Sequence, residues 1–503
     1  MPSTKTITDL IKRDEPYVRI AGQNQSVIRR KQAMAAHVLE TFVQRYGHRD
    51  QVRVYHVPGR LEFTAGKHTD YVGLPVPNFA IDRGFLAMVA PADTPTVTMA
   101  PTGPAYPGIQ FGLEDLDPDL SALEVPHDVD GGGAQQWRNY PITVLQRMCR
   151  NFHDLRGRDG VEVAFGSDLP PASGMSSSSA LMIMTFIACA GANGLLEEEY
   201  FRRSMRGTDR RGTLENLALY LACCENGSRF ENPTTGVVLE GQEGVGTFGG
   251  SQDHVAILLG RRGHLGVNDF CPIRHMEEIP WPEQLGVAVC YAMPASKTEE
   301  AKRGFNSLRE RADEVCRVVS EWLGALGEYS HTGDILRDRP EIESKEVSRY
   351  LRSRPEFREG RLAERWEMAY RQARVHLPMV IDMLRRGRHE ALGCLSSREH
   401  AMSWANLGNI APLVDAVQKC ALAAGALGAS GFGGGFGGSL FALVQRSRMG
   451  EFLQDWQDRA RPHIESYRRR ESRQDYEPAF FPVRPASGAC ELFVEDPRIL
   501  PAP

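Results

Sequence analysis

The chain has 503 residues, of which 42% are apolar and 24% are charged, and these proportions exclude a mainly disordered or fibrous protein. Its 59 basic and 64 acidic residues leave a net charge of −5, which gives no support for binding to nucleic acid or to an anionic membrane. Ten cysteines without a C-x-x-C pair disfavour a zinc site and are typical of reduced thiols. The most apolar stretch, Ala180–Ala192, is too short to cross a bilayer, so we expect a cytoplasmic protein.

Helical and strand patterns both occur along the chain, whose length predicts roughly three domains. Apolar spacing and strand-forming residues predict, in chain order, a helix over Val27–Val43, strands over Val52–His56 and Val161–Phe165, an apolar helix from Ala180, a helix over Leu214–Glu225, a buried strand over Val255–Leu259, amphipathic helices over Asp313–Leu323 and Glu364–Arg385, and an apolar run over Leu440–Val444. Residues 92–137 and 226–250 are rich in turn-forming residues and predict irregular structure. The mixture favours an α+β or α/β fold with at least two lobes.

A first polar cluster lies in VPGRLEFTAGKHTDYVG, Val57–Gly73, directly after a predicted strand. Arg60, Lys67, His68 and Asp70 can form a polyol-binding set, because a carboxylate accepts hydrogen bonds from hydroxyls while lysine and imidazole donate them. A polar surface turn capped by the aspartate explains the same residues, and on these residues alone it is the simpler interpretation.

A second motif, PPASGMSSSSAL at Pro170–Leu181, places glycine and serine at the start of an apolar helix. Glycine lets a ligand approach the backbone, and the first turn of a helix offers free N–H groups and a dipole that favours anions. The segment therefore predicts a phosphate-binding loop, although not a Walker A loop, whose lysine motif is absent. A serine N-cap on a buried helix is an equally good interpretation.

A third motif, GASGFGGGFGGSLFALV at Gly428–Val444, is a glycine-dense loop that leads into an apolar strand. Such a loop indicates unusual backbone geometry or close ligand contact. Phe432 and Phe436 argue against a flexible linker, in which aromatic side chains would be exposed to water.

Together these segments resemble the GHMP small-molecule kinases, and among them the galactokinase branch. Pro58–Tyr71 is similar to P-G-R-x-N-x-I-G-E-H-T-D-Y, with one extra residue between Arg60 and Gly66. The serine segment resembles P-x-x-x-G-L-S-S-S-A, and Gly428–Ser439 resembles G-A-R-M-T-G-A-G-F-G-G-C. Gly249–His254 resembles C-G-I-M-D-Q, and Cys224–Asn226 resembles the A-E-N that precedes it. The motifs follow the family's order.

The resemblance implies a two-lobed α+β GHMP kinase fold. A ribosomal-S5-like N-terminal domain with the sugar and ATP motifs is expected over residues 1–275, and a ferredoxin-like C-terminal domain with the third motif over residues 276–503. The implied activity is the ATP-dependent phosphorylation of a monosaccharide, galactose or a related hexose, at its anomeric C1 hydroxyl. ATP and Mg²⁺ are the implied cofactors. The expected partner is a small sugar, with no nucleic acid and no membrane, and a monomer is favoured.

The resemblance also assigns roles to residues. Asp253 would be the catalytic carboxylate, with Arg60 beside it as a second catalytic residue, and Ser178 and Glu225 would hold Mg²⁺. The loop that binds ATP would comprise Gly174, Ser176, Ser177, Ser178 and Ser179. The sugar would contact Arg60, Lys67, His68, Asp70, Gly250, Asp253 and Phe305. The third motif would contribute Gly434, Gly435 and Gly437 near the phosphates.

The chain departs from the family pattern in four places. One residue is added between Arg60 and Gly66, Lys67 stands where the family has glutamate, Phe305 where it has tyrosine, and the spacing from Glu225 to Asp253 is longer. We hypothesise that Lys67 favours an acidic hexose such as galacturonate. Other open alternatives are a kinase for arabinose, fucose or a heptose, and a non-catalytic regulator that binds sugar and ATP. The first motif speaks against a mevalonate kinase.

Overall fold

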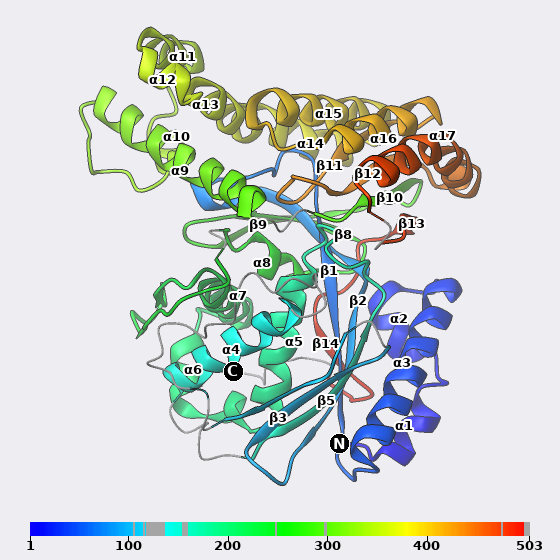
Figure 1. Ribbon diagram of the computed structural model, residues 1–503. Coiled ribbons are helices and arrows are strands. Elements are labelled where there is room, and N and C mark those ends of the chain that lie inside the picture. Colours follow the sequence, from blue (N-terminus) through cyan, green and yellow to red (C-terminus); the bar gives the residue numbers. More distant parts are fainter. Residues whose placement is uncertain are drawn as a thin grey trace.

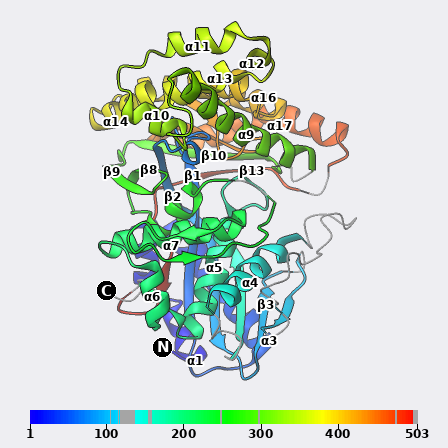
Figure 2. The same ribbon diagram turned by 90° about the vertical axis from the view of Figure 1, so that its left-hand side faces the viewer.

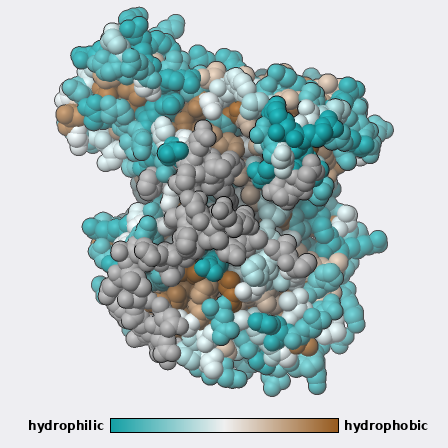
Figure 3. Space-filling view, in the orientation of Figure 1, coloured by the Kyte–Doolittle hydropathy of each residue, from teal (hydrophilic) through white to brown (hydrophobic). Residues whose placement is uncertain are grey.

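The computed structural model describes residues 1–103, 106–113, 116, 136–152, 159–246, 249–295, 299–473 and 476–496. An eight-stranded sheet with helices on both faces forms the lower lobe of Figure 1, and a four-stranded sheet under a layer of helices forms the upper lobe. Figure 3 shows that the molecule narrows between them. The two-lobed α+β fold expected from the resemblance is confirmed.

The first sheet has the strand order β14-β1-β2-β5-β3-β4, and β8 and β9 extend it beside the first part of β2. Its strands are β1 Arg53–Glu62, β2 Val76–Pro91, β3 Thr96–Pro101, β4 Ile109–Gly112, β5 Val161–Ser167, β8 His264–Asp269, β9 Arg274–Pro280 and β14 Cys490–Leu492. Every pairing is antiparallel except that of β3 with β5. The predicted strands at 52–56 and 161–165 are confirmed within β1 and β5.

Helices cover both faces of this sheet, as Figure 1 shows. One face carries α1 Thr4–Leu10, α2 Glu15–Ala21 and α3 Gln25–Tyr46, and the other carries α4 Asn139–Asn151, α5 Ser177–Ala192, α6 Glu199–Met205, α7 Arg210–Asn226 and α8 Gln252–Leu259. Short pieces complete the lobe: η1 Asp70–Val72, η2 Gln136–Arg138, η4 Leu195–Glu197, β6 Phe230–Glu231 and β7 Val238–Leu239. Helix α5 is apolar on all sides because it is the innermost helix, buried from Ser179 to Gly191.

The predicted strand over Val255–Leu259 is wrong, because these residues form the second half of α8. A run of five apolar residues has no period that distinguishes a buried strand from a buried helix. The helix packs against β1, β2, α5 and α7, so nearly every side has to be apolar. The other predicted helices are found within α3, α5, α7 and the long helices of the upper lobe. Of the segments expected to be irregular, 104–105, 114–115, 117–135 and 247–248 lie outside the described residues.

The second sheet has the order β11-β12-β10-β13, formed by β10 Leu285–Met293, β11 Gly428–Gly431, β12 Gly438–Gln445 and β13 Ala479–Val483. All three pairings are antiparallel. Strands β11 and β12 form a hairpin whose connection, residues 432–437, is the glycine-dense loop. The hairpin therefore holds both ends of that loop at the edge of the upper lobe.

Helices form a layer over this sheet, seen from two directions in Figures 1 and 2. They are α9 Glu299–Trp322, α10 Thr332–Asp338, α11 Ser344–Ser353, α12 Pro355–Glu359, α13 Leu362–Arg371, α14 Leu377–Arg385, α15 His389–Met402, α16 Pro412–Ala423 and α17 Met449–Arg470, with a short η7 at Arg446–Arg448. Two π-helical turns, η5 Gln372–His376 and η6 Ser403–Leu407, follow α13 and α15 directly. The single helix predicted over residues 364–385 is thus α13, η5 and α14 in succession. None of the helices in the described ranges is long and apolar enough to cross a bilayer.

The chain crosses between the lobes twice. Strand β9 of the first sheet ends at Pro280, and β10 of the second begins at Leu285. After β13 the chain returns to the first lobe, where Pro485 bridges to Ile81 and Leu492 of β14 pairs with Val54 of β1. The division into domains 1–275 and 276–503 stays a prediction, and the last strand belongs to the first sheet.

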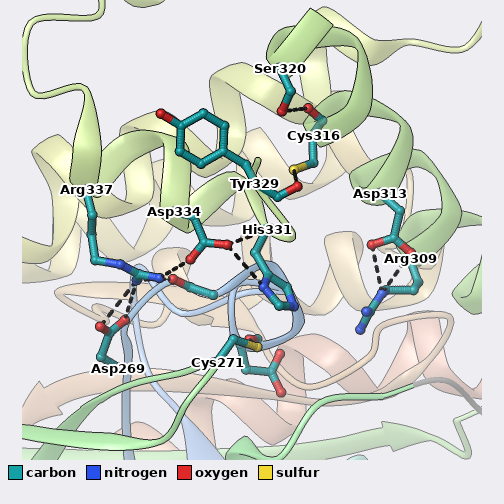
Figure 4. Close-up of polar contacts among 12 residues, drawn as sticks. Asp269, Cys271, Arg309, Asp313, Cys316, Ser320, Tyr329, His331, Asp334 and Arg337 are labelled. Carbon is teal, nitrogen blue, oxygen red and sulfur yellow. Dashed lines mark hydrogen bonds and ion pairs between the residues drawn. The ribbon is translucent and has the colours of Figure 1, made fainter. Parts of the chain in front are cut away.

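Helix α10 docks the helical layer onto the first sheet and onto the loop that follows β1 (Figure 4). The Arg337 guanidinium donates to the carbonyl of Gly73 at 2.7 Å and to the Asp269 carboxylate of β8 at 3.3 Å. His331 and Asp334 form a capping box at the start of the helix, and Asp334 also accepts from Arg337. The thiol of Cys271 donates to the Asp70 carbonyl. These contacts fix the loop that carries the first motif.

A buried charge cluster fixes the segment that leads into the serine motif. The Asp168 carboxylate, two residues before Pro170, accepts from Arg30 at 2.7 Å and from Lys31 at 3.0 Å, both on α3. The amide of Gly84 on β2 donates to the same carboxylate. Burial would raise the pKa of Asp168, but the Lys31 and Arg30 charges and this amide outweigh it and lower the pKa to about 2. Lys31 is fully buried, so its charge depends on Asp168.

We predict that Asp168→Asn lowers the free energy of unfolding by about 3 kcal/mol at pH 7, because it removes the main counter-charge of the buried Lys31 ammonium. The Asp168 pKa is lowered in the folded state, so this loss should be complete above pH 5 and should shrink as the pH falls through about 4 towards 2. Urea titrations at several pH values measure it. Asp455→Asn, in an exposed pair with Arg459, is the control and should change stability by less than about 0.5 kcal/mol. Equal losses in both variants would contradict the prediction.

Candidate active site

The site is built around the Arg60 guanidinium, which stands near the end of β1 and is almost completely buried. Its Nε donates to Oδ1 of Asp253 at 2.6 Å, and its Nη1 donates to the Gly174 carbonyl at 2.7 Å. The second carboxylate oxygen of Asp253 accepts from the Ser176 hydroxyl at 2.5 Å. One arginine therefore joins the first motif, the serine motif and the start of α8, which are far apart in the sequence.

Asp253 is ionised by this arrangement. Burial would raise the pKa of its carboxyl, but the charge of Arg60 and the hydrogen bonds from Arg60 and Ser176 outweigh burial and hold the pKa below its usual value. A quarter of the side chain remains exposed. Ser176 has a φ of +58°, a left-handed conformation that is rare for serine. Such local strain is typical of functional sites, and here it accompanies a hydroxyl bonded to Asp253.

A cavity of about 260 Å³ opens beside Asp253. Its lining contains most of the predicted site residues: Arg60, His68, Asp70, Gly174, Ser178, Ser179, Glu225, Gly250, Asp253, Phe305, Gly434, Gly435 and Gly437. Lys67, Ser176 and Ser177 are not part of this lining. Residues that the sequence did not single out also line it, including Glu62, Tyr71, Tyr140, Gln252 and His254.

His68 and Asp70 form the polar wall contributed by the first motif. The His68 ring contacts the Tyr71 hydroxyl at 2.9 Å and the Gly434 carbonyl at 3.1 Å, and burial together with the charges of Arg365 and Lys67 lowers its pKa to about 3. The ring is therefore neutral. Asp70 accepts from the backbone N–H of Gln252 at 3.2 Å, and burial raises its pKa to about 6. A Cβ on Gly250 would lie 2.0 Å from the Asp70 carboxylate, so only glycine fits there.

The third motif closes the cavity from the upper lobe. Gly435 has a φ of +82°, and a Cβ there would lie 2.3 Å from the Asn409 carbonyl. A Cβ on Gly434 would lie 3.1 Å from the ring of Phe305, which also contacts the His68 ring at a centroid distance of 5.5 Å. The glycines therefore allow the loop to lie directly against both the first motif and α9.

A second cavity of about 320 Å³ adjoins the first, and Tyr140 and Ser178 line both. Aromatic side chains from β2, β5, the β3–β4 connection, η2 and the start of α4 line its walls: Phe85, Phe165, Tyr106, Trp137 and Tyr140. Ser177 and Leu181 of α5 complete one side. An aromatic-lined cavity next to a serine-rich helix N-terminus suits a planar base attached to phosphates. The sequence did not predict this cavity.

Three family models match the chain in the order of the motifs. The galactokinase galactose-binding signature matches residues 40–91, the GHMP kinases N terminal domain matches residues 139–212, and the GHMP kinases C terminal model matches residues 380–461. The chain therefore matches the models of both GHMP kinase domains and the galactose-binding signature, and its relatives make it a galactokinase-like sugar kinase.

The relatives of this chain match most of its length. A galactokinase from Streptomyces coelicolor is 27% identical over 417 residues, which are 82% of this chain and 90% of the relative. A galactokinase from Thermococcus kodakarensis is 27% identical over 88% of this chain and its own full length. The crystal structure of Lactococcus lactis galactokinase complexed with galactose superposes with a TM-score of 0.65 at 19% identity, covering 90% of this chain and 98% of the other. This last match supports the fold.

In this chain, Glu225 offers the oxygen ligands that a hard cation requires. Its Oε2 accepts from the Ser179 hydroxyl at 2.8 Å and lies 3.3 Å from Nε2 of His254. Ser178, which is expected to hold the metal with Glu225, immediately precedes Ser179 and lines both cavities. The described residues contain no group of three or more His, Cys, Asp or Glu side chains that could hold a metal. One carboxylate and adjacent hydroxyls fit Mg²⁺, which keeps waters and shares its coordination with phosphates.

Lys67 of this kinase is directed away from the cavity. Its ammonium donates to the Gly431 carbonyl of β11 at 2.7 Å, and the side chain is buried. Burial lowers the pKa of Lys67, and the nearby carboxylates of Glu62 and Glu399 oppose that shift. The lysine therefore links the first motif to β11, the strand with which the third motif begins.

Glu62 is a cavity residue that the sequence reasoning missed. It lies two residues after Arg60 on β1. Because residues two apart in a strand face the same side, its spacing from Arg60 could have predicted its place in the cavity. Its carboxylate accepts from the Gln252 side chain at 3.2 Å, and burial raises its pKa to about 7 in spite of Lys67 and Arg60. Near neutral pH, the protonated and the ionised forms of the Glu62 carboxyl group are therefore both populated.

We predict that Glu62→Gln removes a pH dependence of stability. The raised pKa means that the folded wild type holds the proton more tightly than the unfolded chain, so its stability falls as the pH rises from about 4 through 7. Relative to wild type, the variant should therefore gain about 3 kcal/mol of unfolding free energy between pH 4.5 and pH 8. Denaturant titrations across this range measure it. Glu451→Gln, at an exposed residue of α17, is the control, and identical pH profiles for both variants would refute the prediction.

Proposed function

We propose that this GHMP kinase transfers the terminal phosphoryl group of ATP to the anomeric C1 hydroxyl of a neutral hexose, with galactose as the substrate that its relatives indicate. The observation that carries the proposal is the Asp253 carboxylate, ionised by Arg60 and Ser176 at the point where a polar cavity meets the start of helix α5. The galactokinase relatives and the galactose-binding family model support galactose.

In the proposed reaction, Asp253 receives the proton of the sugar hydroxyl. The hydroxyl oxygen then forms a bond to the terminal phosphorus as the bond to the bridging oxygen breaks, and ADP leaves with that oxygen. Phosphoryl transfer passes through a loose transition state, so positioning and electrostatic stabilisation carry most of the catalysis. Arg60 keeps Asp253 ionised and adds positive charge close to the transferred group.

The two adjoining cavities are proposed to bind different substrates, the sugar in the cavity beside Asp253 and ATP in the aromatic cavity. The aromatic cavity beside Phe85, Trp137 and Phe165 takes the adenine, and the phosphates pass Ser178 towards Gly174. The N-terminus of α5 favours the negative charge of the phosphates. Glu225 with the hydroxyls of Ser178 and Ser179 would hold Mg²⁺, which when bound offsets phosphate charge.

The sugar cavity favours a neutral ligand. Its charged lining residues are four carboxylates, Glu62, Asp70, Glu225 and Asp253, and one guanidinium, Arg60. A sugar carboxylate would meet a negative potential there. The galacturonate hypothesis depends on Lys67. Its ammonium donates to the Gly431 carbonyl and interacts with Glu62, so it is not available to a sugar carboxylate, and an acidic hexose is not proposed. Arabinose, fucose and a heptose differ from galactose without carrying charge and remain alternatives.

A non-catalytic regulator that binds sugar and ATP would not need an activated carboxylate at the acceptor position. The contacts of Asp253 with both Arg60 and Ser176 support catalysis over that alternative. ADP formation distinguishes the two, because a regulator binds both ligands and forms none.

We predict that Asp253→Asn lowers sugar-dependent ADP release at least 100-fold while Mg-ATP binding measured by calorimetry is retained, because the amide cannot accept the proton. Asp455→Asn, exposed on α17, is the control and should keep wild-type turnover. Wild-type protein that binds galactose and ATP but forms no ADP would overturn the kinase proposal.

We also predict that wild-type protein uses galactose with a kcat/KM at least 10-fold above that for galacturonate, since the cavity lining is acidic. Lys67→Met should change the two values by similar factors, because its ammonium contacts a backbone carbonyl and does not line the cavity. Initial rates with a monosaccharide panel measure this, with Lys419→Met as an exposed control. A galacturonate preference that disappears in Lys67→Met would restore the acidic-hexose hypothesis.

A further inference from the structure

We propose that a small oxyanion of the phosphate class binds between helices α9 and α13, in a site formed by Arg311, Arg361 and Arg365. Neither the catalytic cavity nor the aromatic cavity includes any of these arginines. The proposal concerns a separate site and is independent of the proposed kinase activity.

The helical positions bring the three guanidinium groups to one place. Arg361 immediately precedes α13, and Arg365 follows four residues later, so both lie on the same side of that helix. On α9, Leu308 and Val315 lie three residues before and four residues after Arg311, and both are buried against residues of α13. Arg311 therefore faces α13. Burial lowers the pKa of Arg311, and the charges of Arg361 and Arg365 lower it further, as their proximity requires.

Within the described ranges, the cluster lacks the counter-charges that buried arginines require. Arg365 is fully buried; its Nη2 donates to the His68 carbonyl at 2.6 Å, and it also interacts with the Tyr71 hydroxyl, whose pKa it lowers against the effect of burial. Its Nε and Nη1, and Nη1 of Arg311, are buried without an acceptor in the part of the chain that the structure describes. Arg361 donates to the Ala405 carbonyl.

No carboxylate of the described residues forms an ion pair with any of the three, although the charge of Glu364 acts on Arg311. The ring of Tyr71, whose centroid lies 5.7 Å from Cζ of Arg365, offers only a partial substitute. Like charges four residues apart repel each other, and a buried charge without a partner is strongly unfavourable. An anion bound among the three would remove both costs.

The donor set selects the chemical class. Guanidinium groups present planar pairs of N–H donors that match phosphate and carboxylate oxygens, and three positive charges against one acidic neighbour favour a dianion. Arg311 and Arg361 are partly exposed while Arg365 is buried, so the site opens to solvent with Arg365 at its inner end. Free phosphate and the phosphoryl group of a small metabolite share this chemistry.

The site also has a direct connection to the first motif. Arg365 holds the His68 carbonyl, and Arg309 and Arg365 both approach the Tyr71 ring, at 5.1 and 5.7 Å from its centroid. His68 and Tyr71 line the catalytic cavity. An anion that neutralises Arg365 therefore acts on a side chain that supports the wall of the proposed sugar site.

The test compares Arg311→Met with Arg317→Met. Both positions are on α9 and both changes remove one charge, but Arg317 is exposed and paired with Glu314 and Glu321. Calorimetric titrations with inorganic phosphate, at constant ionic strength and without nucleotide, should show binding to wild type and to Arg317→Met. Arg311→Met should bind at least 10-fold more weakly. Phosphate that binds at the serine helix would be retained in both variants, so the difference isolates the arginine site.

Thermal unfolding gives a second readout. In buffer with chloride as the only anion, Arg311→Met should melt at the same temperature as Arg317→Met or higher, because it removes repulsion. Phosphate should raise the melting temperature of Arg317→Met and not that of Arg311→Met. Glycerol 3-phosphate in place of phosphate shows whether a phosphate monoester fits as well as the free ion. Equal phosphate affinity in Arg311→Met and Arg317→Met, or no binding to wild type, would overturn the proposal, and Arg361→Met provides an independent variant.

Discussion

The structure depends on the position of one guanidinium group. Arg60 donates simultaneously to the Asp253 carboxylate and to the Gly174 carbonyl, so the end of β1, the serine loop and the start of α8 share one fixed point. The third motif is tied to the same point, because a Cβ on Gly433 would lie 2.8 Å from the Gly174 carbonyl and 3.4 Å from Arg60. Buried charges keep a single geometry only when each has its partner, which is why these segments meet in one arrangement.

The charges around the cavity are arranged in layers. The charged side chains of the lining are mostly acidic, and several basic groups lie behind it: Lys67 behind the first motif, Arg365 behind His68, and Arg30 and Lys31 behind the approach to the serine loop. A cation or a neutral polyol is compatible with the lining, whereas anions are attracted only where backbone N–H groups or arginines are available. The near-neutral net charge of the whole chain hides this separation.

Much of the site could be predicted from sequence, because the motifs carry residues that lie next to each other in the fold, such as Arg60, Asp70, Glu225 and Asp253. The orientation of Lys67 could not, since Ala65 has a φ of +75° and His68 a φ of +55°, and these turns decide which way the lysine points. The aromatic cavity could not be predicted from sequence either. Phe85 and Phe165 come together only when β2 pairs with β5, and Trp137 joins them from another part of the chain. The buried helix α8 was mistaken for a strand because its apolar run has no usable period.

The return of the chain to the first lobe affects how the protein is made. Strand β14 pairs with β1, and Leu492 and Ala486 pack with the N-terminal helices in one core, so an early and a late segment of the chain share the lower lobe of Figure 1. On a ribosome, β1 is synthesised early but its edge is covered only when nearly the whole chain has emerged. The upper lobe, whose strands all lie between residues 285 and 483, is complete before then. During synthesis the edge of β1 in the first sheet therefore stays unpaired until β14 has been made.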